Sequence, residues 1–441
     1  MAKREKFGSR MAYVMALAGS AIGLGNIWRF PYIVGEHGGA LFILVYLFFS
    51  FVISMPILFG ESVIGKKSHR STYDAMDMLA PGTGWKYLGL LTVISPFIIV
   101  SYYSVVGGWS IDYLVRSCAG GLNCASQESA AALFSRSSST AWETLASFTA
   151  FLLLTAGIIV LGVKKGIEKF SKLAMPALFF LIVFIAIYSM TLPGSMEGVK
   201  YLVKPDFSKF GLDTLSFALG QSFYSLSLGV GIVLTYSSYM KDEDSVVKSG
   251  TSAAVFDSLF AILAGFAIMP AVFAAGIKPG AGPALIFESL PYTFSCMSEQ
   301  MPVVGAVVTF LFFLTILTAA LTSSVSLYEV CESHLIERWK MSRLKASAII
   351  FVAAWLLGAS CALSFGPLKD VEIFGNSIFG FCDLISSNYL MTLGALAFSI
   401  FAGWKMKKAD VQSEVGSFFY FMIRWVSPIV IIVIFISNML L

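Results

Sequence analysis

The chain has 441 residues, of which 57% are hydrophobic, 15% aromatic and 13% charged. Soluble domains carry about 25% charged residues, so this composition, with a mean hydropathy of +0.81, excludes a soluble domain and indicates a polytopic membrane protein. The net charge of +4 does not indicate nucleic-acid binding, because the Lys and Arg residues gather in short segments between apolar stretches, where they set membrane topology.

Eleven apolar stretches are long enough to cross a bilayer, since about 20 helical residues span a hydrocarbon core of about 30 Å. They lie at 11–34, 40–65, 86–114, 145–163, 172–192, 214–240, 249–275, 303–334, 345–364, 376–402 and 418–440. Basic residues precede the first stretch and follow every even-numbered one, which predicts a cytoplasmic N-terminus and an extracytoplasmic C-terminus. We expect a multi-pass protein of the plasma (inner) membrane, lying in the lipid bilayer, whose first stretch is retained rather than cleaved.

Short glycine-bearing segments interrupt the first and sixth stretches. The first segment reads Ser-Ala-Ile-Gly-Leu-Gly-Asn over residues 20–26, and the second reads Ser-Leu-Ser-Leu-Gly-Val-Gly over 225–231. Glycines in membrane helices also serve close helix packing. Non-helical backbone at membrane depth survives only where it lines a protein-enclosed cavity, and a matched pair of interruptions is typical of the substrate site of a secondary transporter. We therefore interpret both segments as functional.

The two interrupted stretches are five spans apart, so the second group of five helices enters the membrane in the opposite sense. This pattern predicts an all-α polytopic fold of two inverted five-helix repeats with broken first and sixth helices and one additional helix. The expected units are residues 1–192 for the first repeat, 193–403 for the second, and 404–441 for an inner loop and the eleventh helix. Residues 276–302 are expected to form a lid over the outer face.

Polar side chains occur at membrane depth near these interruptions. Asp257 lies inside the seventh stretch, and an intramembrane carboxylate is costly and is functional by default. Thr322 and Ser323 lie inside the eighth stretch, although hydroxyl groups there also bond to their own helix. Glu61, near the inner end of the second stretch, is expected to pair with a loop backbone or with an arginine.

The sequence gives little indication of metal binding, hydrolysis or direct use of ATP. None of the six cysteines has the spacing of a metal site, and Cys118 and Cys124 share one loop, where a disulfide and free thiols are both open. An intramembrane serine hydrolase would need a His or Lys base at membrane depth, and no His lies there, so we do not expect an enzyme. No phosphate-binding Walker motif occurs, so ATP is not expected to drive the protein directly.

The segment Leu-Gly-Asn-Ile-Trp-Arg-Phe-Pro-Tyr over residues 24–32, followed by Gly-Gly-Ala over 38–40, resembles the signature of the neurotransmitter:sodium symporters. The resemblance runs from Arg4 to the tenth stretch, through 165–169 and 321–324. It implies a fold with two broken helices, which agrees with the pattern above, and it implies sodium symport of a small molecule.

The resemblance also implies ligand sets. The substrate would lie among residues of the two interruptions and the third and eighth stretches, namely Ser20, Ala21, Leu24, Gly25, Ile99, Tyr103, Tyr224, Ser225, Ser227, Val230, Ser326 and Leu327. One sodium site would use Ala21, Asn26, Ser225 and Asp257. A second would use the carbonyls of Gly19, Ile22 and Ala319 with the hydroxyls of Thr322 and Ser323.

Position 23 discriminates between substrates. Members of the family that carry monoamines have an Asp there, whereas this chain has Gly23, so the substrate must supply its own carboxylate. No charged side chain is expected in the pocket. The sequence therefore predicts a neutral, apolar or aromatic L-amino acid.

Asp257 stands at a family sodium-ligand position that Asn usually holds. Members that require chloride have neutral residues there, and Tyr46, Gln221 and Ser225 match their chloride-binding positions. We expect the Asp257 carboxylate to replace chloride, so that transport does not require this anion.

The resemblance also implies two gates. Arg29 would meet an acid of the tenth helix at the outer gate, with Asp383 as the candidate and Asp370 or Glu372 as alternatives. At the inner gate, Arg4 would pair with Glu337, supported by Tyr239 and Phe7.

The expected mechanism is sodium-driven uptake by alternating access. Rival hypotheses are proton coupling through Asp257, a channel, and an amino-acid sensor that does not transport. The sequence leaves open the identity of the amino acid, the sodium stoichiometry, proton antiport and the oligomeric state. The absence of a twelfth span and the short termini favour a prokaryotic member.

Overall fold

The computed structural model describes residues 5–277 and 283–440 of the chain. The helices of the first half are α1 (Arg10–Ala21), η1 (Gly25–Arg29), α2 (Phe30–Glu36), α3 (Ala40–Phe48), η2 (Phe49–Ser54), α4 (Met55–Ser68), α5 (Thr72–Leu79), α6 (Trp85–Cys118), α7 (Gln127–Ser139), α8 (Ala141–Val160), η3 (Val163–Glu168), α9 (Lys169–Met190) and α10 (Ser195–Val203). The elements of the second half are η4 (Phe207–Lys209), α11 (Leu212–Ser225), α12 (Ile232–Ser237), α13 (Val246–Ala274), η5 (Leu285–Ser289), α14 (Leu290–Gln300), α15 (Pro302–Trp339), α16 (Arg343–Leu363), β1 (Glu372–Ile373), β2 (Asn376–Ser377), α17 (Ile378–Asp383), η6 (Leu384–Leu390), α18 (Met391–Ile400), η7 (Phe401–Lys405), α19 (Lys408–Phe421), η8 (Met422–Val426) and α20 (Ser427–Leu440).

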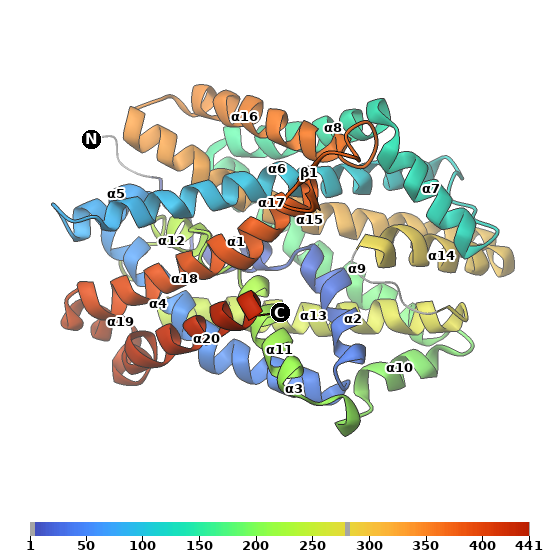
Figure 1. The fold of residues 1–441 in the computed structure, drawn as a ribbon, viewed down its shortest axis with the longest axis horizontal. Helices are drawn as coiled ribbons and strands as arrows, with labels where there is room; N and C mark the ends of the chain where they lie inside the picture. The colour runs from blue at the N-terminus through green and yellow to red at the C-terminus, as the bar shows by residue number, and fades with distance from the viewer. Residues whose placement is uncertain (1–4, 278–282, 441) are drawn as a thin grey trace.

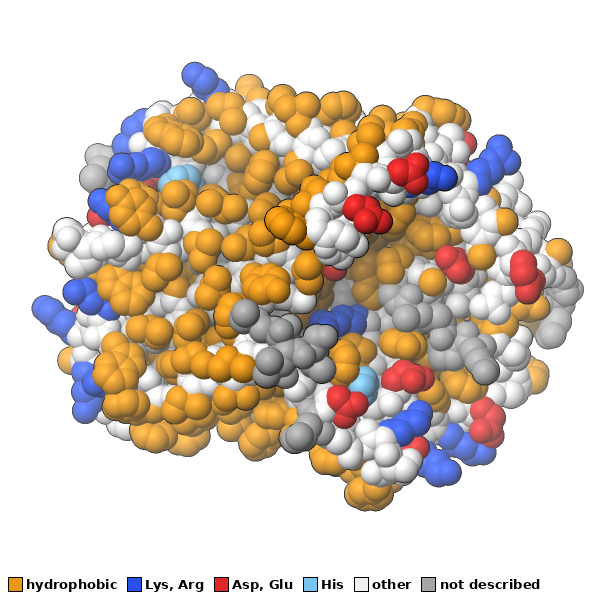
Figure 2. Space-filling view, viewed as in Figure 1, with side chains coloured by type: hydrophobic (Ala, Val, Ile, Leu, Met, Phe, Trp, Pro, Cys, Tyr) orange, Lys and Arg blue, Asp and Glu red, His pale blue; other side chains and the backbone are white. Residues whose placement is uncertain are grey.

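The long helices run side by side along one axis, and several shorter helices lie at its two ends (Figure 1). Helices α7, α10 and α14 lie at one end, and α5 and α19 at the other. Figure 2 shows apolar side chains over most of the middle of this face and most Lys and Arg side chains near the ends, as expected for a bundle that faces lipid in between. In the described residues, β1 and β2 form a two-stranded antiparallel hairpin in which Glu372 pairs with Ser377.

Within the described residues, nine helices are long and apolar enough to span a membrane, and α1 with η1 and α2 makes a tenth candidate that is bent by 57°. Each overlaps one of the expected stretches. The expected sixth span, 214–240, is divided into α11, with 14 residues, and α12, with 6 residues, so neither piece can span alone. The count of eleven therefore depends on treating these two pieces as one interrupted span, and it stays a prediction.

Helix α1 lies at the centre of the bundle, where it packs against α9, α12, α13 and α15. Its residues from Ala16 to Ala21 are all buried. Helix α11, the first half of the other interrupted stretch, packs against α3 and η2. Helix α1 therefore contacts three continuous helices, α9, α13 and α15, and also α12, the second half of the other interrupted stretch.

Local backbone explains where the second interruption occurs. Ser227, Gly229 and Gly231 have φ angles of 52°, 80° and 72°, a left-handed conformation that ends a helix and that glycine adopts without strain. In the first interruption, Ile22 takes an extended conformation with ψ of 104° and ends α1.

The expected outer lid lies partly outside the described residues, which resume at 283. Pro283 lines the wall of a large cavity, and η5 is anchored in the bundle because the Tyr113 hydroxyl donates to the Phe287 carbonyl at 2.9 Å. The described part of this segment is thus packed against the bundle.

Candidate functional site

A central cavity lies between the two interruptions. Its walls come from α1, η1, α6, α11, α12, α15 and α18. It is lined by Ser20, Ala21, Gly23, Leu24, Gly25, Asn26, Ile99, Tyr103, Tyr224, Ser227, Val230, Ile232, Ser323, Leu327 and Met391. Ten of the twelve residues predicted for the substrate pocket are in this set.

The other two predicted pocket residues lie beside the cavity. The Ser225 hydroxyl donates to Asp257, and the Ser326 hydroxyl donates to the Ser323 carbonyl at 2.6 Å in its own helix. Met391 and Ile232 line the cavity without having been predicted as pocket residues, and Gly23, the position predicted to discriminate between substrates, also lines it. An apolar residue in an apolar helix such as Met391 carries no sequence signal of this role.

One end of the cavity presents hydrogen-bond donors. The Leu24 amide donates to the Tyr103 hydroxyl at 3.3 Å, so both groups lie at one point beside the N-terminus of η1. A free helix N-terminus favours an anion. The space around it is tight: a Cβ atom on Gly25 would lie 2.5 Å from Cε1 of Tyr224, and one on Gly23 would lie 2.8 Å from Oγ of Ser323. Both positions need glycine for the present geometry.

The two interruptions are joined directly, and a buried carboxylate supports the second. The Ser227 hydroxyl donates to the Ser20 carbonyl at 3.2 Å. Oε1 of Glu61, from α4, accepts a hydrogen bond from the Gly229 amide at 2.8 Å, and Glu61 is fully buried. The sequence predicted either a loop backbone or an arginine as the partner of Glu61, and the partner in the structure is the backbone of the interruption. The carboxylate thus satisfies an amide that the interrupted helix leaves without an intrahelical partner.

Asp257, from α13, lies at the centre of a buried polar cluster. Its Oδ1 accepts from Nδ2 of Asn26 at 2.7 Å, and its Oδ2 accepts from the Ser225 hydroxyl at 2.7 Å and from the Tyr46 hydroxyl at 3.4 Å. Asp257 is fully buried. Among the described residues, both amide atoms of the buried Gln221 have no hydrogen-bond partner. Asn26, Ser225 and Asp257 are therefore brought together as the sequence predicted.

The residues of the second predicted sodium site also meet. The Ser323 hydroxyl donates to the carbonyls of Ser20 at 3.3 Å and Ile22 at 3.2 Å, and the Thr322 hydroxyl donates to the Ala319 carbonyl at 2.9 Å. A Cβ atom on Gly19 would lie 3.4 Å from Cβ of Thr322. The end of α1 and the middle of α15 thus bring several hard oxygen atoms together, the ligand type that a sodium ion prefers.

A second cavity, called the outer cavity after the predicted topology, lies next to the central one and shares Tyr103, Tyr224 and Met391 with it. Arg29 and Asp383 both line this outer cavity. The Arg29 guanidinium lies 5.4 Å from the centroid of the Tyr224 ring, and Asp383 accepts from the Tyr102 hydroxyl at 2.9 Å. Among the described residues, no ion pair within 4.0 Å joins Arg29 to Asp383, and neither of the alternative acids, Asp370 and Glu372, lines this cavity.

At the opposite end, Arg4 lies outside the described residues, so its predicted pair with Glu337 is not seen here. Oε2 of Glu337 accepts from the Ser71 amide at 2.7 Å. The Phe7 ring packs against the rings of Tyr13, Tyr236 and Tyr239, and the Phe7 amide donates to the Tyr239 carbonyl at 2.9 Å.

Sequence reasoning missed a buried charged group beside this inner end. Arg343, at the start of α16, donates to Glu329 at 3.0 and 3.1 Å and to Glu332 at 3.4 Å, and both glutamates are fully buried in α15. The Tyr239 hydroxyl also donates to Glu329, at 2.5 Å. The signal that was available is the presence of two acids in the inner half of an apolar helix.

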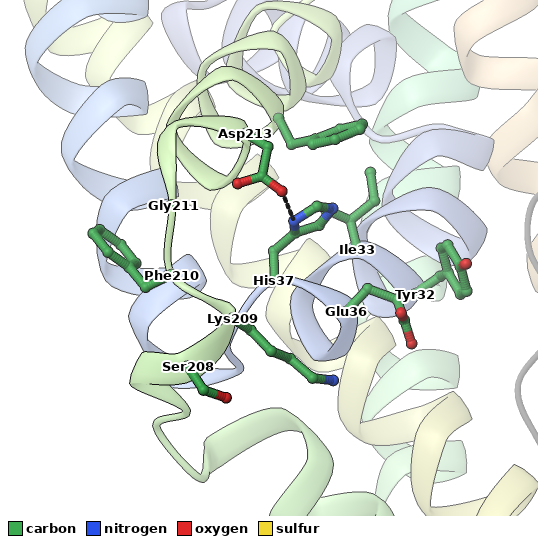
Figure 3. A pocket seen from close by; sticks show the side chains of 10 residues that line it. Tyr32, Ile33, Glu36, His37, Ser208, Lys209, Phe210, Gly211 and Asp213 are labelled. Carbon is green, nitrogen blue, oxygen red and sulfur yellow. Dashed lines mark ion pairs between the residues drawn. The ribbon is translucent and has the colours of Figure 1, made fainter.

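A further pocket opens on the surface beside the outer half of the first interrupted helix (Figure 3). Nδ1 of His37, just after α2, lies 3.9 Å from Oδ2 of Asp213, in the first turn of α11. Burial lowers the pKa of His37 below its ordinary value of 6.5, and this effect outweighs the opposing effect of Asp213. The contact links the end of α2, in the first interrupted stretch, to the start of α11, in the second.

Comparison with known proteins agrees with this architecture. The profile of the sodium:neurotransmitter symporter family matches residues 4–132 and 131–441. The chain belongs to this family. The symporter is 38% identical to the sodium-dependent transporter YhdH of Bacillus subtilis, over 99% of this chain and 98% of that protein, and 37% identical to a sodium-dependent transporter of Haemophilus influenzae, over the same shares. It is therefore a transporter rather than an enzyme.

The symporter also matches a solved structure over nearly its whole length. The crystal structure of MhsT in complex with L-phenylalanine superimposes with a TM-score of 0.90 at 38% identity, covering 99% of this chain and 100% of that one. A more distant relative, the sodium-dependent neutral amino acid transporter B(0)AT2 of Bos taurus, is 30% identical over 60% of this chain and 41% of its own. The symporter thus has the fold of MhsT.

Proposed function

We propose that the symporter takes up a neutral, apolar or aromatic L-amino acid together with sodium, by alternating access and without a requirement for chloride. The observation that supports this most directly is the composition of the central cavity, where the Leu24 amide and the Tyr103 hydroxyl meet and no acidic or basic side chain forms the described wall. Those donors suit a substrate carboxylate. The crystal structure of MhsT contains L-phenylalanine, which supports the same substrate class.

An amine without a carboxylate fits this cavity poorly. A monoamine would need a nearby acid, and Gly23 supplies none, while the crowding at Gly23 by Ser323 leaves little room for one. The substrate ammonium would instead meet carbonyls of the two interruptions, at Ala21, Tyr224 and Ser225. The apolar walls formed by Ile99, Val230, Leu327 and Met391 suit an apolar or aromatic side chain.

Two sodium ions are proposed as co-substrates. One would lie at Ala21, Asn26, Ser225 and Asp257, where the Ser225 hydroxyl oxygen lies 2.7 Å from an Asp257 carboxylate oxygen and the Asn26 amide group contacts the same carboxylate. The other would lie between Gly19, Ile22, Ala319, Thr322 and Ser323. Each ion would join the end of an interrupted helix to a continuous one, so sodium binding would order the cavity before the amino acid enters.

Asp257 is proposed to supply the negative charge that chloride supplies elsewhere in the family. Tyr46 and Ser225 donate to its carboxylate, and these are two of the positions matched to chloride binding. A fixed carboxylate at this depth would balance the charge of the adjacent sodium ion, since an isolated charge is costly in a low-dielectric interior.

In the proposed cycle, the central cavity opens alternately to the two faces of the inner membrane. The proposed topology has eleven spans, a cytoplasmic N-terminus and an extracytoplasmic C-terminus. Closure of Arg29 toward Asp383 would seal the outer cavity, which both side chains line. Sodium entry is driven by its gradient and by the membrane potential, which supplies about 2.3 kcal/mol per charge per 100 mV.

The experiment uses purified protein in proteoliposomes with an imposed sodium gradient. Labelled L-phenylalanine is offered, and the other amino acids and several monoamines are tested as competitors, with gluconate in place of chloride. We expect accumulation above the outside concentration, competition by apolar and aromatic amino acids only, and full activity in gluconate. Uptake that follows a pH gradient when sodium is replaced would show proton coupling instead, and binding without accumulation would show a sensor.

A further inference from the structure

Two thiols face each other near the outer gate. Cys361 lies two residues before the end of α16, and Cys382 lies in α17, directly before Asp383. Sγ of Cys361 lies 3.7 Å from Sγ of Cys382, and the two side chains are 0% and 6% exposed. Helices α16 and α17 pack against each other and are connected through the β1–β2 hairpin.

We propose that Cys361 and Cys382 are a modification site that is oxidised to a disulfide bond. A disulfide requires the sulfur atoms to come to about 2.05 Å, so the two thiols need to approach each other by roughly 1.7 Å. The proposal rests on the topology proposed above, which places this end of the bundle on the extracytoplasmic, oxidising side, where disulfides persist.

The other cysteines do not offer such a pair. In the described structure Cys118 is exposed, and Cys124 is buried with its amide donating to the Ser295 hydroxyl at 2.8 Å. The Cys331 thiol donates to the Val93 carbonyl at 3.7 Å. The contact between Cys361 and Cys382 is the only thiol–thiol contact within hydrogen-bonding range among the described residues. All six cysteines are free thiols in the described structure, so of the two options that the sequence left open for Cys118 and Cys124 the structure has free thiols.

The reaction is a thiol–disulfide exchange with a disulfide-bearing oxidant. Cys382 is the less buried of the two, and its neighbours Phe379 and Asp383 line the outer cavity, so its thiolate attacks the oxidant first. This step forms a mixed disulfide and releases one oxidant thiol. The Cys361 thiolate then attacks Sγ of Cys382 and releases the second oxidant thiol. The two cysteines lose two protons and two electrons, and the oxidant is reduced to a dithiol.

The bond would fix one side of the outer gate. Helix α16 packs against α6 and α8 in the continuous part of the bundle, whereas α17 carries the acid Asp383. A disulfide would hold Asp383 at a constant distance from α16, so that closure of the outer cavity would come from movement of the Arg29 side.

The test counts thiols in the full-length protein purified from membranes without reductant. The protein is denatured, alkylated with a maleimide and weighed by intact mass spectrometry, before and after reduction. We expect four alkylated cysteines before reduction and six after it, because the chain has six cysteines. Peptide mapping of the unreduced wild type should give a linked peptide that contains residues 361 and 382. Six alkylated cysteines without reduction would overturn the proposal.

Matched double variants separate this pair from the alternative. Cys118→Ser with Cys124→Ser should give two alkylated cysteines before reduction and four after it, whereas Cys361→Ser with Cys382→Ser should give four in both. A linked peptide that contains residues 118 and 124 would also overturn the proposal. The thiol count does not depend on the substrate, so sodium-coupled uptake together with six free thiols would reject the disulfide and leave the proposed function intact.

Discussion

The Ser227 hydroxyl and the Ser20 carbonyl, 3.2 Å apart, form a hydrogen bond that joins the two interrupted helices. Each residue belongs to a segment in which some backbone N–H and C=O groups have no hydrogen-bond partner within their own helix. Both residues line the central cavity. This contact ties together two segments that are about two hundred residues apart in the chain. The shape of the cavity therefore depends on it.

Replacing Ser227 with glycine removes this bond without straining the backbone, because φ at this position is 52° and suits glycine. A net hydrogen bond contributes about 1 kcal/mol, or about fivefold in affinity. We expect a rise of about fivefold in the KM for amino-acid uptake in proteoliposomes. The control is Ser110→Ala, which removes a buried hydroxyl that donates only to the Val106 carbonyl of its own helix. An unchanged KM in Ser227→Gly would contradict this role.

Replacing Gly25 with alanine should narrow the cavity. The new Cβ would lie 2.5 Å from Cε1 of Tyr224, so the ring must move, and such overpacking costs about 1–3 kcal/mol. We expect affinity for an aromatic amino acid to fall by about tenfold or more, as measured by equilibrium binding in detergent. Gly157→Ala is the matched control, because a Cβ atom there meets nothing within 4 Å.

Replacing Asp257 with asparagine should create a chloride requirement. The side chain keeps its size and can still contact Asn26 and Ser225, but the fixed negative charge is lost. We expect sodium-driven uptake by Asp257→Asn to be low in gluconate and to recover when chloride is added, while wild-type uptake is the same in both. A wild-type requirement for chloride, or recovery with any anion regardless of its size, would exclude the proposed replacement.

Lowering the pH should destabilise the folded protein through protonation of His37. Because burial lowers its folded pKa below 6.5, the unfolded chain binds a proton more readily, so the stability that the neutral ring contributes is full above 6.5 and decreases as the pH falls below that value. The melting temperature in detergent should therefore fall between pH 7.5 and 5.5, and His37→Gln should reduce the fall. Asp213→Asn removes a charge that raises this pKa, and it should make the fall steeper; a shallower fall in that variant would contradict the argument.

Replacing Asp383 with asparagine should impair the outer gate. Asp383 accepts hydrogen bonds from Tyr102 and Ser387 and lines the cavity that Arg29 also lines. Loss of the Asp383 charge removes the electrostatic attraction that would draw the Arg29 side chain across the outer cavity toward residue 383. We expect uptake to slow by about tenfold, which corresponds to about 1.4 kcal/mol, while sodium-dependent binding of the amino acid persists. Asp370→Asn, outside the cavity, should leave uptake unchanged.

Much of this arrangement could be predicted because polar residues are rare at membrane depth. Asn26, Ser225 and Asp257 stand out in apolar stretches, and they meet within 3.2 Å. The same reasoning could not find Met391, since its apolar side chain resembles its neighbours, nor the contact of Arg343 with Glu329, which joins two helices across a turn. The positions of such residues depend on how segments distant in the sequence pack against each other, and the periodicity of the sequence carries no information about that packing.

The cysteine pair also could not be predicted from the sequence. The sequence left both a disulfide and free thiols open for Cys118 and Cys124, which share one loop, whereas the two thiols that meet in space are those of Cys361 and Cys382, 21 residues apart. A hairpin between two helices brings these thiols together, and no local pattern marks it.

The second interrupted helix and α18 approach so closely that no side chain fits between them. A Cβ atom on Gly229 would overlap the Met391 carbonyl, and one on Gly394 would overlap the Gly229 carbonyl. Met391 begins α18, which follows Asp383 in the chain after a single π-helical segment, η6. Because the two backbones are in direct contact, with no flexible side chain between them, the second interruption cannot shift toward α18 without displacing the backbone of that helix.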